Sequence, residues 1–236
     1  KGTKCLVVRK LTQAVIDSDQ FGCASSYNQG SYSRYGKYNF VEEGLRLGSM
    51  LGRKLQVRTE SRETKYTRKN TGRIDKRLIA ELGFGNDGVF SQTFIDSFPD
   101  AFLHISIDAS GSMSGDKWRK TMKSVTSMVK AIDMIEGVDV VVSFRSTQHS
   151  YGRSTEDYPI ILIAYDSRVD SLVKVKTLWK SINVAGTTPE GLCYEAVMDE
   201  MVAGGTDKES YFLNFSDGMP MFSNGVVDYY HDTAIN

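Results

Sequence analysis

Between residues 101 and 217 short apolar segments alternate with amphipathic ones, and this alternation constrains the fold more than any other feature of the chain. The apolar segments predict strands at 101–108, 138–144, 159–165 and 210–215. The amphipathic segments predict helices at 116–137, 167–181 and 188–202. Strands that alternate with helices form a mostly parallel sheet with helices on both faces. We therefore expect an α/β, Rossmann-like fold.

The first predicted helix and the strand after it carry the clearest patterns. In the helix, apolar residues recur at intervals of three and four, which buries one face: Trp118, Met122, Val125, Val129 and Ile132. The strand at 138–144 is rich in Val and shows little alternation, as expected where both faces of a sheet are covered. Both patterns place these segments inside a layered core.

Residues 1–100 are less regular. The segment 21–40 is rich in Gly, Ser and Tyr and predicts a loop. Residues 41–55 have apolar residues near helical spacing, but three glycines weaken the prediction of a helix. We therefore expect two parts: an irregular N-terminal extension over 1–100, and an α/β domain over 101–236.

A basic run lies within this extension. Residues 53–77 contain ten Lys or Arg and three acidic residues. Such a run forms either a solvated surface or an electrostatic contact with an acidic partner, for which Arg68, Lys69 and Arg73 are the candidates. Tyr66 is its only aromatic residue, which disfavours nucleic acid as the ligand because single strands bind through stacked aromatic side chains.

Polar side chains follow the predicted strands at three places. Asp108, Ser110 and Ser112 follow the first strand, Thr187 precedes the last helix, and Asp217 follows the last strand. Ligand sites of open α/β sheets lie beyond the carboxyl ends of their strands. Oxygen ligands without His or Cys suit a hard cation, Mg²⁺ first and Mn²⁺ or Ca²⁺ as alternatives. Asp, Ser and Gly also form ordinary turns, so each cluster alone is a weak signal.

Catalytic motifs are lacking. The stretch GSMSG at 111–115 resembles a nucleophile elbow, but its central residue is Met113 rather than Ser. The sequence has no phosphate-binding loop ending in Gly-Lys-Ser or Gly-Lys-Thr, and its three cysteines have no metal-ligand spacing. No apolar run approaches the roughly 20 residues of a membrane span. We therefore expect a non-enzymatic, cytoplasmic protein without a membrane segment.

These clusters resemble the metal-ion-dependent adhesion site of the von Willebrand factor A-type domain. DASGS at 108–112 is similar to the Asp-x-Ser-x-Ser start of that site, GTTPEGL to its threonine loop, and SDG to its distal aspartate motif. The resemblance implies a divalent cation bound by Asp108, Ser110, Ser112, Thr187 and Asp217, with Thr188 as the alternative threonine. Complete domains continue with another helix, strand and helix, so it also implies that the last elements are missing here.

A second resemblance covers about residues 41–236. TGRIDKRLIAELGFGNDGVF, followed by DAFLHISIDASGSMSGDKW, is similar to the C-terminal part of CobT-type cobaltochelatase subunits and their phage-borne relatives. In that family the domain works beside a ring-forming AAA+ ATPase of the MoxR type, and the ATPase hydrolyses the ATP.

Two functions follow as expectations from these resemblances. The first is a metal-dependent protein-binding module that docks a carboxylate of a partner and acts with an AAA+ ATPase. The second is a structural or adhesion module in a larger assembly such as a phage particle. The expected location is the cytoplasm, or the host cytoplasm or virion if a phage encodes the protein.

Overall fold

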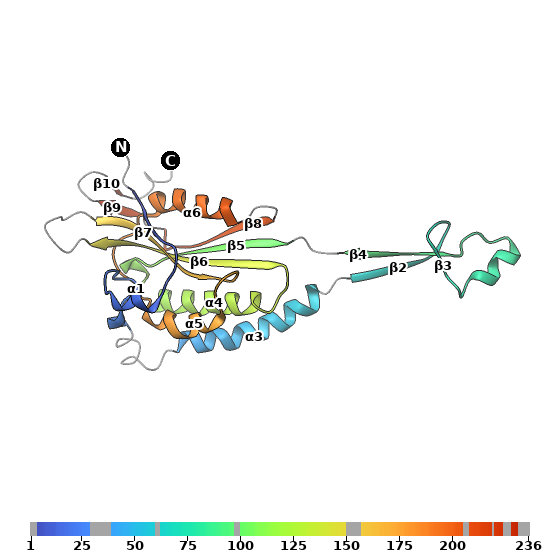
Figure 1. Cartoon of the computed structure of the whole chain (residues 1–236), viewed down its shortest axis with the longest axis horizontal. Coiled ribbons are helices and arrows are strands. Elements are labelled where there is room, and N and C mark those ends of the chain that lie inside the picture. The colour runs from blue at the N-terminus through green and yellow to red at the C-terminus, as the bar shows by residue number, and fades with distance from the viewer. Residues whose placement is uncertain are drawn as a thin grey trace. The chain divides into compact units, whose positions relative to one another are not determined.

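The computed structural model describes residues 4–28, 39–59, 62–96, 100–149, 157–204, 208–218, 220–223 and 228–230. It divides the chain into two compact units (Figure 1). Unit 1 comprises Lys1–Leu55 and Asp100–Asn236, and unit 2 comprises Gln56–Pro99. This division differs from the predicted boundary at residue 100, because the first 55 residues of the predicted extension belong with the α/β part.

Unit 1 contains a five-stranded sheet of order β1-β7-β6-β5-β8. The strands are β1 (Leu6–Val8), β5 (Ala101–Asp108), β6 (Val138–His149), β7 (Asp157–Asp166) and β8 (Glu209–Phe215). All neighbours are parallel except β6 and β7, which are antiparallel. The prediction of a mostly parallel α/β sheet is confirmed, whereas the direction of β7 and the contribution of β1 were not predicted.

Helices cover both faces of this sheet. They are α1 (Gln13–Asp17), α3 (Phe40–Thr59), α4 (Asp116–Ile132), α5 (Leu172–Leu178) and α6 (Glu190–Gly204), with short 3-10 turns η2 (Gly111–Met113) and η3 (Trp179–Ser181). In Figure 1, α6 lies on one face, and α1, α4, α5 and the part of α3 in unit 1 lie on the other. None of the described helices is long and apolar enough to cross a membrane.

Each face of the sheet has its own apolar core. On the side of α4, Trp118, Met122 and Val125 are buried with Phe144 of β6 and Trp179. On the side of α6, a smaller core joins residues of the strands to the helix: Phe102, Val141, Ile161, Ile163, Cys193 and Val197. The sheet is thus held between two apolar layers, and its strand ends remain available for polar residues.

The three glycines of α3 lie where this helix packs against α4. A Cβ atom on Gly44 would lie 2.7 Å from the Cβ of Thr126, and one on Gly48 would lie 2.5 Å from the carbonyl oxygen of Ser127. A Cβ on Gly52 would meet the sulfur of Met134 at 2.7 Å. The glycines that weakened the predicted helix therefore form its contact surface, because they let two helix backbones approach closely.

Beyond Asp217, the described residues of unit 1 form the antiparallel pair β9 (Met221–Ser223) and β10 (Asp228–Tyr230). β9 is tied to the threonine loop, because the backbones of Met221 and Thr188 exchange hydrogen bonds of 3.0 and 3.1 Å. This segment therefore supports the loop that carries the predicted threonine ligand.

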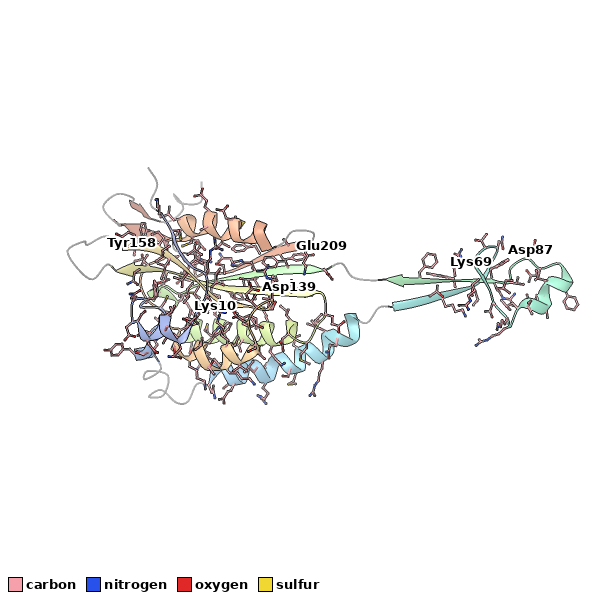
Figure 2. All side chains as sticks on the ribbon, viewed as in Figure 1. Lys10, Lys69, Asp87, Asp139, Tyr158 and Glu209 are labelled. Atoms are coloured by element: carbon pink, nitrogen blue, oxygen red, sulfur yellow. The ribbon has the colours of Figure 1, made fainter. Side chains whose placement is uncertain are left out.

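Unit 2 is a three-stranded antiparallel sheet of order β2-β4-β3. Its elements are β2 (Arg62–Lys69), β3 (Arg73–Ile74), the 3-10 helix η1 (Ile79–Phe84) and β4 (Phe90–Asp96). Figure 2 shows side chains filling the layers around the sheet of unit 1, whereas those of unit 2, including Lys69 and Asp87, spread around its strands. Val89 is the one buried apolar side chain among the residues of unit 2 whose side chains the structure describes.

Candidate metal centre

Asp108 is the last residue of β5 and is fully buried. Its Oδ1 accepts a 2.8 Å hydrogen bond from the backbone N–H of Ser110, which turns the chain back around the carboxylate. Its Oδ2 accepts hydrogen bonds from the hydroxyls of Thr188 at 3.3 Å and Ser216 at 3.5 Å. Residues from three distant segments therefore converge on this carboxylate.

The two predicted serines lie directly beside each other. The Oγ atoms of Ser110 and Ser112 are 2.9 Å apart, and Ser110 is buried whereas Ser112 is exposed. Gly111 between them opens the turn η2, and its N–H donates to the carbonyl of Gly186 at 3.0 Å. This bond joins the serine turn to the threonine loop, so the two motifs form one local structure.

The threonine loop is held against the end of β6. Gly186 has a φ of +74°, and a Cβ there would lie 2.2 Å from Oγ1 of Thr147. The N–H of Thr187 donates to the same Oγ1 at 2.9 Å. Glycine is therefore required at 186 both for the backbone conformation and for the close approach to β6.

The structure separates the roles of the two threonines. The Thr187 hydroxyl contacts Oγ1 of Thr147 at 3.4 Å. The Thr188 hydroxyl is buried and reaches Asp108. Of the two, the hydroxyl brought to the predicted cluster is thus that of Thr188, the alternative candidate, while Thr187 lies beside it and faces β6.

Asp217 follows β8 and has a side chain that is only 7% exposed. Its Oδ2 accepts from Nζ of Lys117 at 3.1 Å, whereas its Oδ1 is buried and has no hydrogen-bond partner among the described residues. A buried carboxylate oxygen without a donor is costly unless a cation or another donor meets it. This orphaned oxygen fits the presence of a cation in the functional state.

The electrostatics of Asp108 point the same way. Burial raises the pKa of its carboxyl above the ordinary value, and the charge of Asp217 acts in the same direction. The N–H of Ser110 and the guanidinium of Arg145 partly offset these effects and lower the pKa. A divalent cation would stabilise both ionised carboxylates, since each would gain an opposite charge at short range.

Sequence reasoning missed the buried ion pair beneath this cluster. Nη2 of Arg145 on β6 lies 3.1 Å from Oε1 of Glu190, the first residue of α6, and both side chains are at most 4% exposed. Glu190 also accepts from Asn214, and Arg145 donates to Ser106 at 2.7 Å. The network anchors α6, and with it the threonine loop, to the central strands. Its one sequence signal was a charged residue directly after an apolar strand.

The residues present fit a hard divalent cation. Two carboxylates and the hydroxyls of Ser110, Ser112 and Thr188 supply oxygen ligands alone, which suits Mg²⁺, Mn²⁺ or Ca²⁺ better than zinc. Among the described residues, no three His, Cys, Asp or Glu side chains gather into one group. The candidate centre therefore depends on neutral hydroxyls as much as on acids.

The three predicted partner-binding cations all lie in unit 2. Arg68 forms a two-pronged pair with Glu81 at 3.1 and 3.2 Å, and Lys69 lies over the ring of Tyr66 at 5.3 Å. Arg73 lines an open cavity of about 890 Å³ together with three more cations, Lys65, Lys76 and Arg77. Of the three predicted cations, Arg73 is therefore the one that belongs to this cluster of four.

Comparisons with known proteins add no relative. The sequence matches no model of a known protein family, and no curated protein is similar to it.

Proposed function

We propose that unit 1 is a metal-ion-dependent protein-binding module. Asp108, Ser110, Ser112 and Asp217 would hold a divalent cation, Mg²⁺ first, together with one threonine hydroxyl. The observation that carries this proposal is the convergence of these oxygens at the ends of β5 and β8, including the orphaned Oδ1 of Asp217. When bound, the cation would supply an electrophilic position for a carboxylate of the partner.

The residues of the chain explain why such a site would bind a carboxylate rather than act as an enzyme. Two acids and several neutral hydroxyls leave part of the charge of a divalent ion uncompensated, which favours one further anionic ligand. The buried Arg145–Glu190 pair keeps the threonine loop in place without presenting a nucleophile or base to the site. Ser110 and Ser112 bond to each other and, within the part of the chain that the structure describes, to no histidine.

The partner is proposed to be a protein with an exposed acidic residue, acting with an AAA+ ATPase as in CobT-type systems. The partnership with an ATPase rests on the sequence resemblance over residues 41–236. The cavity in unit 2 supports an acidic partner independently, because four cations and one acid, Asp75, line it. Opposite charge on a partner would steer association and make it sensitive to salt.

Calorimetric titration with Mg²⁺ tests the metal centre. We expect Asp108→Ala to abolish measurable binding, with Ser114→Ala, an exposed neighbour in the same turn, as the control that retains it. Thr188→Val should weaken binding by about tenfold or more and Thr187→Val by less than about twofold, by analogy with the loss of groups that support a metal. The opposite order would assign Thr187. Unchanged binding in a folded Asp108→Ala variant would contradict the metal centre.

Affinity capture with and without EDTA tests the partner. An AAA+ ATPase should appear among the captured proteins only in the presence of Mg²⁺, and Asp108→Ala should lose it. Arg73→Glu should weaken capture most at low salt, where exposed charges are least screened. If EDTA does not change the capture of a partner, docking does not use the metal centre. If no ATPase is captured, the CobT-like role is wrong, while the proposal of metal binding stands.

A further inference from the structure

Two of the three cysteines lie next to each other although they are 188 positions apart in the sequence. Sγ of Cys5 is 3.8 Å from Sγ of Cys193, and both thiols are free. A disulfide brings its sulfurs to about 2.05 Å, so the pair needs less than about 2 Å of relative movement to form one. The third cysteine, Cys23, is buried elsewhere in the core of unit 1 and has no cysteine partner.

The two thiols come from elements that meet on one face of the sheet. Cys5 directly precedes β1, which pairs with β7 through three residues, Leu6–Val8. Cys193 lies on α6 and is buried in the core that also contacts Cys5 and Val7. A bond between them would fasten a short edge strand to the helix that begins two residues after Thr188.

We propose that Cys5 and Cys193 form a reversible disulfide that fixes β1 to α6 under oxidising conditions and releases it under reducing ones. The proposal does not depend on the metal centre. Its oxidant is a low-molecular-weight disulfide such as oxidised glutathione, the usual partner in thiol–disulfide exchange.

The two thiols differ in the way such exchange requires. Cys5 is half-buried, and its hydrogen bond with Cys193 lowers the pKa of the Cys5 thiol. Burial raises the pKa of the Cys193 thiol. Cys5 is therefore the attacking thiol, because it is both the more accessible and the more readily ionised.

The reaction balances in two exchange steps. The Cys5 thiolate attacks one sulfur of oxidised glutathione, breaks its S–S bond, forms a mixed disulfide and releases one glutathione thiolate. Cys193 then attacks Sγ of Cys5, gives up its proton to the departing thiolate and releases the second glutathione. Two protein thiols are thereby oxidised to one disulfide, and one glutathione disulfide is reduced to two thiols.

The test is peptide mapping of the full chain after incubation in oxidised glutathione. Trypsin should release residues 5–9 linked to residues 181–208 without reductant, and the link should vanish with dithiothreitol. Cys193→Ala should stop at a glutathione adduct on Cys5, and Cys5→Ser should give neither product. Cys23→Ala serves as the matched control, since it removes a buried thiol and should leave the link intact.

Thermal unfolding provides a second readout that does not depend on mapping. Oxidation should raise the midpoint of the wild-type chain and of Cys23→Ala by about 5 °C or more, since cross-linking distant residues restricts the unfolded chain. The shift should be absent in Cys5→Ser and Cys193→Ala. An oxidised wild-type chain with only glutathione adducts, or with Cys5 linked between two chains, would overturn the proposal.

Discussion

Unit 1 and unit 2 stabilise their sheets in different ways. Unit 1 buries large side chains on both faces of its sheet, among them Trp179 and Phe144, which are fully buried. Unit 2 leaves several large apolar side chains in solvent: Phe84 is 92% exposed, and Phe94 and Tyr66 are each about half exposed. Burial of apolar surface is therefore the main stabilising term in unit 1, whereas unit 2 relies on its strand ladder and surface contacts.

Burial decides how much a polar or charged residue contributes to the stability of each unit. A buried charged group in unit 1, such as Arg145, must be compensated within the protein, because water does not reach it. A charged group in unit 2 is solvated and screened, so the same kind of ion pair contributes little. Matched substitutions in the two units should therefore differ in their effect on stability.

The ion pairs give the largest expected contrast. Arg145→Met leaves Glu190 as a buried charge without its cation, and we expect a loss of about 3–5 kcal/mol in the free energy of unfolding. Arg68→Met removes the partner of Glu81, which is 32% exposed, and should cost less than about 1 kcal/mol. Urea unfolding measures the first, and hydrogen exchange of amides in unit 2 measures the second. Equal losses of free energy would mean that solvent does not weaken the Arg68–Glu81 ion pair relative to the buried one.

The next comparison of the two units uses pH, because His104, the histidine whose pKa is shifted, lies in unit 1. Burial, assisted by the charge of Arg145, lowers the pKa of His104 to about 4. The unfolded chain, with an ordinary pKa near 6.5, therefore binds a proton that the folded chain refuses between these values. The stability that neutral His104 contributes is complete above pH 6.5 and is lost as pH falls toward 4.

From pH 7.5 to pH 5 this linkage should remove about 2 kcal/mol from the free energy of unfolding. His104→Gln keeps a polar group beside Ser143, to which the histidine is bonded at 2.8 Å, and should remove that part of the pH dependence. Residues 56–99 contain no histidine, so amide exchange in unit 2 should not follow the same titration. Parallel pH profiles of the wild type and the variant would exclude His104 as the cause.

Sequence patterns predicted the sheet of unit 1 well where the signal was local. The predicted strand at 101–108 has the bounds of β5, and the predicted helix at 116–137 contains α4. The antiparallel direction of β7 and the pairing of β1 with it depend on contacts between distant segments, which no local pattern encodes. The same holds for unit 2, where β2 pairs with β4 although β3 and η1 lie between them in the sequence.

The candidate site was predictable to a similar extent. Asp108, Ser110 and Ser112 meet within one turn, so their spacing alone placed them together. The choice between Thr187 and Thr188 depends instead on the left-handed conformation of Gly186 and on Thr147, which lies 40 positions away from Thr187. The pairing of Arg145 with Glu190 could not be predicted, because it depends on the packing of α6 against β6.

Substitution of a glycine by alanine should give the smallest difference in stability between the two units, and unit 2 provides a closely matched control. In unit 1, a Cβ on Gly48 would lie 2.5 Å from the carbonyl oxygen of Ser127 and 2.6 Å from Cβ of Lys130, so α3 and α4 would have to separate. In unit 2, a Cβ on Gly83 within η1 would meet no atom within 4 Å. The two positions thus differ in packing, although Ala favours helical backbone over Gly at both.

Overpacking costs about 1–3 kcal/mol and the gain in helix propensity returns about 1 kcal/mol, so Gly48→Ala should lower the free energy of unfolding by about 1 kcal/mol. Gly83→Ala should leave unit 2 unchanged or slightly more protected in hydrogen exchange, because only the propensity gain applies there. If Gly48→Ala stabilised the protein, propensity would outweigh packing between α3 and α4. The glycines would then be tolerated in the helix rather than required by its contact with α4.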